Sequence, residues 1–169
     1  MIRGFGGKNP VIAEETYIAE NALIVGDVKI GDHSSIWPNA VLRGDEGRIT
    51  VGRYTNIQDN VVVHSDLNGF VEIGDYVTVG HGAIIHGCKI KNNVIVGMGA
   101  VVLNNAVIGE NCIIGAGAVV LENAVIQDNS LVVGVPGVVK AALSKDKAAA
   151  IKDNALSYWR LAEEYLHLK

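Results

Sequence analysis

Histidine is the residue type in this chain with the widest range of possible chemical roles, and three of the five histidines lie close together in the sequence. His64, His81 and His86 fall within 23 residues, whereas His33 and His167 stand apart. Neutral imidazole nitrogens are common ligands of zinc, and three of them leave one coordination position open for water. We therefore expect the three clustered histidines to bind a metal ion, and the other two to be solvated surface residues. A polar contact between subunits and a histidine acting as general base are the alternatives.

The element that must position these histidines is defined by a repeat. An aliphatic residue recurs at every sixth position through most of the chain, in four blocks. The repeat residues are Ile12, Ile18, Ile24, Ile30, Ile36, Leu42, Val51, Ile57, Val63, Ile73, Val79, Ile85, Ile90, Val96, Val102, Ile108, Ile114, Val120, Ile126 and Val132. An even spacing places them all on one face of extended strands, whereas on a helix residues six apart point in different directions. Short strands separated by bends, three to a coil of about eighteen residues, predict a parallel β-helix shaped like a triangular prism.

The repeat breaks twice and ends before the C-terminus. The next repeat residue follows Leu42 after nine positions and Val63 after ten, so we expect both intervals to leave the prism as loops. From Ser144 to about Leu166 apolar residues recur at spacings of three and four, which predicts one amphipathic helix with a serine N-cap. The residues expected on its apolar face are Ile151, Ala155, Tyr158, Ala162 and Tyr165. The predicted fold is all-β, with a hexapeptide-repeat β-helix over residues 1–139 and a C-terminal segment, residues 140–169, whose helix packs on the prism.

The predicted prism limits how the three clustered histidines can meet. His64 and His86 each directly follow a repeat residue on the same side of successive coils, so they should stack about 4.8 Å apart. His81 precedes His86 by five residues, about 16 Å of extended chain, and a flat side of the prism cannot fold it back. In a ring of three identical chains, His81 of one copy can meet the pair of its neighbour. The spacing therefore predicts a homotrimer with interfacial metal sites, in which nitrogen ligands favour Zn²⁺, with Fe²⁺ or Co²⁺ also possible.

Composition excludes several classes of protein. The chain has 169 residues, 49% of them hydrophobic, and its 14 basic and 18 acidic side chains give a net charge of −4. That balance argues against a nucleic-acid surface or a basic membrane patch. The long uncharged run at 92–109 contains four asparagines and is too polar to span a bilayer. Because there is no signal-peptide stretch and no disulfide framework, we expect a cytoplasmic protein in which Cys88 and Cys112 are small core residues.

In the order and spacing of its polar motifs, the chain resembles the gamma-class carbonic anhydrases and their homologues. The matching segments are Arg43–Glu46, Asn56–Asp59, His64, Gly80–Gly82 and His86–Gly87. The resemblance implies a homotrimer of left-handed parallel β-helices with a metal ion at each subunit interface. It also implies that His64, His81 and His86 are the ligands, and that carbon dioxide and bicarbonate are substrate and product.

The same resemblance implies roles for residues around the metal. Gln58 corresponds to the residue that hydrogen-bonds the metal-bound hydroxide, and Asn56 to a neighbour that orients it. Arg43 and Asp45 correspond to an ion pair between subunits, with Arg43 placed to attract bicarbonate. Glu46 corresponds to an acidic residue linked to proton transfer.

Two further residues and one departure complete the comparison with the family. Tyr158 corresponds to a tyrosine near the substrate pocket, and Asp59 either belongs to the site or simply suits a corner of the coil. Some members carry a long acidic loop after the first metal histidine, whereas this chain has only the segment 65–70 there.

This short loop and the shared prism leave three alternatives to a carbonic anhydrase. Homologues with short loops include weak or inactive anhydrases described as siderophore-binding proteins or as thioesterases. Hexapeptide-repeat acyltransferases share the prism and use a histidine as general base. A trimeric scaffold or metal binder without catalysis is the third alternative.

Overall fold

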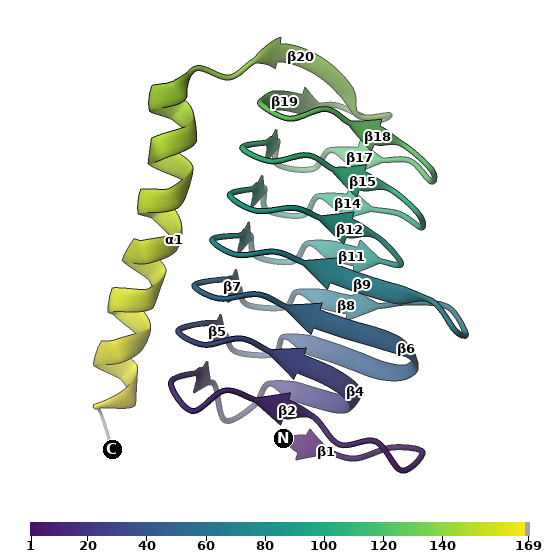
Figure 1. Cartoon of the computed structure of the whole chain (residues 1–169), viewed down its shortest axis with the longest axis vertical. Helices are drawn as coiled ribbons and strands as arrows, with labels where there is room; N and C mark the ends of the chain where they lie inside the picture. The colour runs from purple at the N-terminus through teal and green to yellow at the C-terminus, as the bar shows by residue number, and fades with distance from the viewer. Residues whose placement is uncertain (168–169) are drawn as a thin grey trace.

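A computed structural model, which describes residues 1–167, is a parallel β-helix with one helix running along its side (Figure 1). The strands are β1 (Ile2–Arg3), β2 (Val11–Ile12), β3 (Tyr17–Ile18), β4 (Leu23–Ile30), β5 (Ser35–Ile36), β6 (Val41–Val51), β7 (Asn56–Ile57), β8 (Val62–His64), β9 (Phe70–Ile73), β10 (Thr78–Val79), β11 (Ile84–His86), β12 (Lys89–Ile90), β13 (Ile95–Val96), β14 (Val101–Val102), β15 (Val107–Ile108), β16 (Ile113–Ile114), β17 (Val119–Val120), β18 (Val125–Ile126), β19 (Ser130–Val133) and β20 (Val138–Ala142), and the helix is α1 (Lys145–Leu166). The last two residues of the predicted C-terminal segment, 168 and 169, lie outside the described residues. Among the residues that are described, no helix combines the length and the apolar character that crossing a bilayer requires.

The coils of the prism form three faces, each a stack of parallel strands. The apolar face consists of the first half of β4, the first half of β6, and β8, β11, β14 and β17. The charged face consists of β2, the second halves of β4 and β6, and β9, β12, β15 and β18. The helix-covered face consists of β3, β5, β7, β10, β13, β16 and β19, and β20 extends it as an antiparallel partner of β19. Val102 pairs with Val120, which confirms the predicted coil of eighteen residues.

The repeat residues point into the prism and form its core, as predicted. From Ile24 to Val120 every one of them is at most 2% exposed. Burying a Val, Leu or Ile side chain contributes about 1.5–3 kcal/mol, so this aliphatic stack is the main source of stability. Cys88 and Cys112 lie in the same core, fully buried, and burial raises the pKa of the Cys88 thiol to about 12.

Asparagines turn many of the corners of the prism. Asn93, Asn111 and Asn129 have φ angles of 58°, 56° and 60°, a left-handed conformation that asparagine tolerates better than most residues. Their side chains form a ladder along the corner: the amide of Asn93 donates to Asn111 at 2.7 Å, and that of Asn111 to Asn129 at 3.1 Å. Each corner is therefore tied to the corner of the next coil.

The two interruptions of the repeat have different outcomes. The first was expected to be a loop, but β6 runs unbroken from Val41 to Val51. Its pairing with β4 shifts instead, so that Val25 pairs with Arg43 and Val28 with Ile49, and the extra residues bulge outward where the strand turns the corner. The second interval leaves the prism between β8 and β9, as predicted.

Helix α1 lies along the helix-covered face, against β3, β5 and β7 (Figure 1). The Oγ atom of Ser144 accepts a hydrogen bond from the Lys147 amide at 3.4 Å, which confirms the predicted N-cap. The buried side chains of the helix are those of Ile151, Ala155, Trp159 and Ala162. The sequence pattern put Tyr158 on this face and left out Trp159, but Trp159 is the buried one because its indole packs in a cluster with Trp37. Tyr158 lies half-buried at the edge of the contact.

Candidate metal centre

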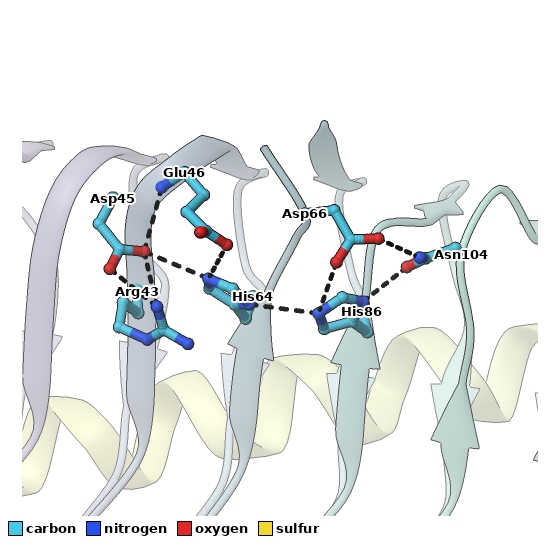
Figure 2. A network of polar contacts seen from close by, with 7 residues as sticks. All are labelled: Arg43, Asp45, Glu46, His64, Asp66, His86 and Asn104. Carbon is cyan, nitrogen blue, oxygen red and sulfur yellow. Dashed lines mark hydrogen bonds and ion pairs between the residues drawn. The ribbon is translucent and has the colours of Figure 1, made fainter. Parts of the chain in front are cut away.

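His64 and His86 lie side by side on successive coils, at the corner between the apolar and charged faces (Figure 2). They end β8 and β11, and these strands pair them directly, as the sequence predicted. The Nδ1 atom of His64 lies 3.2 Å from the Nε2 atom of His86. Two nitrogen ligands of a tetrahedral zinc ion, each about 2.05 Å from the metal, are about 3.3 Å apart. The spacing of the pair therefore suits one shared ion.

The outer nitrogen of each ring faces a hydrogen-bond acceptor (Figure 2). His64 Nε2 lies 3.2 Å from Asp45 Oδ1, and His86 Nδ1 lies 2.5 Å from Asn104 Oδ1. The Asn104 amide nitrogen donates to Asp66, so its oxygen must face His86. Both outer nitrogens then carry the ring proton, and the two inner nitrogens face each other with lone pairs. Such facing lone pairs repel unless a cation lies between them, so the donor set fits a metal ion.

Three residues of β6 surround His64. The Arg43 guanidinium donates to both carboxylate oxygens of Asp45, at 2.9 and 2.8 Å. Burial opposes ionisation of Asp45, but the hydrogen bonds from Arg43 and His64 outweigh it and lower the pKa of the carboxyl. The Glu46 carboxylate lies 3.6 Å from His64 Nε2.

The ion pair between subunits that the family resemblance implies for Arg43 and Asp45 stays a prediction. In the single chain the two side chains pair with each other. The physical reason is their spacing, because residues two apart on an extended strand project to the same side.

His81 lies at the opposite corner of the apolar face, in the turn between β10 and β11. Its ring is about half exposed, and its Nδ1 atom lies 2.8 Å from Asp59 Oδ2. A carboxylate at Nδ1 keeps the proton there and leaves Nε2 free to bind a metal. Within residues 1–167, the structure therefore does not bring His81 together with His64 and His86.

Gln58 and Asn56 lie beside His81 and are almost fully buried, at 3% and 1% exposed. Gln58 Nε2 donates to Asn56 Oδ1 at 3.0 Å, and Gln58 Oε1 accepts from the His81 backbone N–H at 3.2 Å. Asn56 Nδ2 donates to the Thr78 hydroxyl at 2.9 Å, which in turn donates to Asn154 Oδ1 on α1, also at 2.9 Å. The two amides thus belong to the His81 half of the site.

Tyr158 belongs to the same half. Its ring meets that of Trp37 edge-on, with centroids 5.9 Å apart. Burial, followed by the negative charge of Asp59, raises the pKa of the Tyr158 hydroxyl. The phenol is therefore neutral at physiological pH and close to the Asp59–His81 pair.

Four residues of this arrangement were not predicted from the sequence: Asp66, Thr78, Asn104 and Asn154. The stacking rule could have found Asn104, because it lies eighteen residues after His86, one coil along the prism. Thr78 and Asn154 are 76 residues apart, and no local pattern connects them.

His33 corrects the expectation of a solvated surface histidine. Its ring nitrogens lie 2.8 Å from Glu15 and 3.1 Å from Asp32, and its ring stacks on Tyr54 with centroids 4.7 Å apart. These three side chains are the one group of described residues whose ligand atoms could surround a metal ion within a single chain. Each ring nitrogen lies within 3.1 Å of a carboxylate oxygen, but the contact of Nδ1 with Asp32 lacks hydrogen-bond geometry.

Comparison with known proteins identifies the family. The family model "Bacterial transferase hexapeptide (six repeats)" matches residues 9–44 and 87–122. A protein of Methanocaldococcus jannaschii named "Probable carbonic anhydrase" is 56% identical over 153 residues, 90% of this chain and 96% of that protein. "Gamma carbonic anhydrase 1, mitochondrial" of Arabidopsis thaliana is 40% identical over 164 residues, 94% of this chain and 60% of that protein. The chain belongs to the gamma-class carbonic anhydrase family. A crystal structure of a hexapeptide transferase family protein from Anaplasma phagocytophilum has a TM-score of 0.93 and 37% identity, covering 97% of each chain.

Membership of the gamma class agrees with the architecture of the prism and with the order of the polar motifs along it. The names of these relatives describe those proteins. The function of the His64–His86 pair and of His81 in this chain is inferred from their geometry.

Proposed function

We propose that this chain is a metal-dependent carbonic anhydrase that works as a homotrimer, with each site assembled between two subunits. The division of the histidines between two corners of one face carries this proposal. His64 and His86 stand at one corner of the apolar face and His81 at the other. A cyclic trimer built on that face brings His81 of one subunit to the pair of the next.

The outward residues of the apolar face support this assembly, because they are aliphatic along its whole length. They are Leu23, Val41, Val62, Ile84, Val101 and Val119. Val62 and Ile84 are 39% and 42% exposed in the single chain. On the charged face Lys29, Thr50, Glu72 and Lys89 hold the matching positions in the central strands, and only the outer strands β2, β15 and β18 have valines there. Helix α1 covers the third face. The apolar face is thus the one whose burial in a trimer would be favourable.

Zn²⁺ is the ion that we assign to this site, with Fe²⁺ and Co²⁺ as the alternatives that imidazole ligands also suit. His64 and His86 of one subunit and His81 of its neighbour would hold it. When bound, the ion supplies a Lewis acid that lowers the pKa of water from about 15.7 to about 7, so that hydroxide is available at neutral pH. Asp45, Asn104 and Asp59 hold the ligand protons on the outer nitrogens.

The other polar residues bind and orient the reactants. The Arg43 side chain is 45% exposed and has N–H groups beyond those that bind Asp45, so it can attract bicarbonate. Gln58 offers its amide oxygen as the acceptor that orients the attacking hydroxide. Glu46 is 49% exposed beside His64, a suitable place for a carboxylate that passes a proton to solvent. Tyr158 lines the approach as a neutral phenol.

The proposal includes a cytoplasmic location and no nucleic-acid or membrane partner. Both cysteines are free and buried, which suits a reducing compartment.

The test combines metal analysis and catalysis on one sample. Protein is purified anaerobically, and its metal content, its mass by light scattering and its stopped-flow rate of carbon dioxide hydration are measured. We expect a trimer with about one metal ion per subunit. Hydration should be lost in His64→Ala and kept in His167→Ala, which alters an exposed histidine after the end of α1.

Two outcomes contradict the proposal in different ways. A trimer with full metal and no hydration would leave a metal-binding protein without anhydrase activity. A metal-free protein that transfers acyl groups from acyl-CoA would favour the acyltransferase alternative.

A further inference from the structure

A chain of buried side-chain hydrogen bonds connects helix α1 to the metal half-site at His81. It begins at Asn154 of α1, continues through Thr78 of β10 and Asn56 of β7, and ends at Gln58. The Gln58 oxygen then accepts from the backbone N–H of His81 at 3.2 Å. The first of these hydrogen bonds joins two residues, Asn154 and Thr78, that are 76 apart in the sequence.

These side chains occupy buried positions where apolar residues would cost less free energy to bury. Asn56, Gln58 and Thr78 are 1%, 3% and 5% exposed, under α1. Further along the same face the matching outward positions carry Ile95 and Ile113. A buried amide or hydroxyl destabilises the fold unless it is hydrogen-bonded. A buried network of polar side chains at this position therefore suggests a functional reason for its presence.

The direction of the whole chain of hydrogen bonds follows from its His81 end. The His81 backbone N–H can only donate, so it must face the oxygen of the Gln58 amide. The Gln58 nitrogen then faces the Asn56 oxygen, and the Asn56 nitrogen faces the Thr78 oxygen. The Thr78 hydroxyl hydrogen is left for Asn154, which must offer its oxygen. Asn154 is therefore the terminal acceptor.

We propose that Asn154 and Thr78 are positioning residues that determine which end of the Gln58 amide the site meets. This inference rests on the proposed function, in which Gln58 offers an oxygen to the attacking hydroxide. Without the acceptor of Asn154, the Thr78 hydroxyl turns to the Asn56 oxygen, and the Asn56 amide reverses, giving up its 3.5 Å contact with Val77 O. The NH₂ groups of Asn56 and Gln58 then face each other. This clash of two donors opposes the hold of the His81 N–H on the Gln58 oxygen, so the Gln58 amide turns over and presents its NH₂ group, which cannot accept a hydrogen bond. Asn154 of α1 thus contributes to catalysis without touching the reactants.

The competing explanation is that the Asn154–Thr78 hydrogen bond only attaches the helix to the prism. Substitutions that keep the shape and remove the hydrogen bond distinguish the two. Thr78→Val and Asn154→Leu remove the hydroxyl and the acceptor, and Thr78→Ser restores the hydroxyl. Ser157→Ala is the matched control on α1, because among the described residues the Ser157 side chain bonds only the helix's own backbone, at Asn154 O.

The first measurement needs neither metal nor activity. In ¹⁵N-labelled metal-free protein, we expect Thr78→Val and Asn154→Leu to shift the resonances of the His81 backbone N–H and the Gln58 side-chain NH₂. Thr78→Ser and Ser157→Ala should leave both in place. Unmoved resonances in Asn154→Leu would overturn the proposal, whether or not the protein hydrates carbon dioxide.

The second measurement is a double-mutant cycle in the hydration assay. Losing one hydrogen bond to a charged group predicts about a tenfold fall in kcat/KM for Asn154→Leu, with zinc content and trimer mass unchanged. In a Gln58→Ala background the same substitution should have no further effect on kcat/KM, because Asn154 acts through the Gln58 amide and that amide is absent. Equal losses in both backgrounds would mean that Asn154 only holds the helix. If the parent protein shows no hydration, the proposed function fails and the resonance measurement alone decides the inference.

Discussion

Two disabled variants should complement each other if each metal site is shared between subunits. His81→Ala leaves the His64–His86 pair intact at one corner of the apolar face, and His64→Ala leaves His81 intact at the other. Each variant alone has two ligands at every interface, and we expect it to bind little zinc and to show no hydration. Inside a mixed trimer, an interface is complete when the pair comes from a His81→Ala subunit and His81 comes from a His64→Ala subunit.

The size of the recovery follows from the geometry of the ring. Each interface has a direction, because one subunit gives the pair and its neighbour gives the single histidine. With equal amounts and random assembly, the chance of the productive order is one half times one half, so about a quarter of the sites should be complete. Every trimer with both kinds of subunit has one complete site of its three, whatever its composition.

The assay is co-expression of the two variants with different affinity tags, purification of mixed trimers through both tags, and measurement of zinc and of hydration. Doubly tagged trimers should hold about one zinc ion per three subunits and about a third of the wild-type rate. The matched control combines His64→Ala with His86→Ala, which damage the same half-site and should recover nothing. Zinc bound by the His81→Ala variant alone, or no recovery in the mixed trimers, would refute the shared site.

Three further predictions concern the interface, the corners and the core. Ile84→Glu places a charge on the apolar face and should give a folded monomer without zinc, by light scattering and circular dichroism, whereas Lys89→Glu at the matching position of the charged face should leave a trimer. Asn111→Ala should lower the free energy of unfolding by about 1–2 kcal/mol in denaturant titrations, more than Asn111→Gly does, because its φ is 56°. The Cys88 thiol has its pKa raised to about 12 and should resist a thiol reagent in the folded protein at pH 8 and react on unfolding. Because unfolding lets that thiol ionise from about pH 8.5 upward, stability should decline between there and pH 12, less steeply in Cys88→Ala; an unchanged slope would contradict the assignment.

The stacked pair of histidines could be predicted because it depends on local periodicity. His64 and His86 each follow a repeat residue, and a parallel β-helix converts that regularity into neighbours in space. The same reasoning placed His81 at a different corner. The family resemblance added Gln58 and Asn56, which the structure places beside His81.

Other parts of the site escaped sequence analysis because their partners are distant in the chain. Asn104 meets Asp66 across 38 residues, through a loop whose course the repeat does not define. The predicted helix face included Tyr158 and left out Trp159, because the pattern could not show that Trp159 fits against Trp37. The prediction of a loop between Leu42 and Val51 was also wrong, since these residues belong to β6 and a bulge accommodates the extra ones.

The sequence by itself determined the prism and the division of its histidines, because a six-residue period acts on each strand separately and repeats the same inward and outward pattern. Only the tertiary structure decided how each imidazole is oriented. Hydrogen-bond direction depends on which donor meets which acceptor, and those partners come from neighbouring coils and from α1. The proton on His86 Nδ1, the oxygen that Gln58 offers and the acceptor that Asn154 supplies are therefore properties of the folded chain.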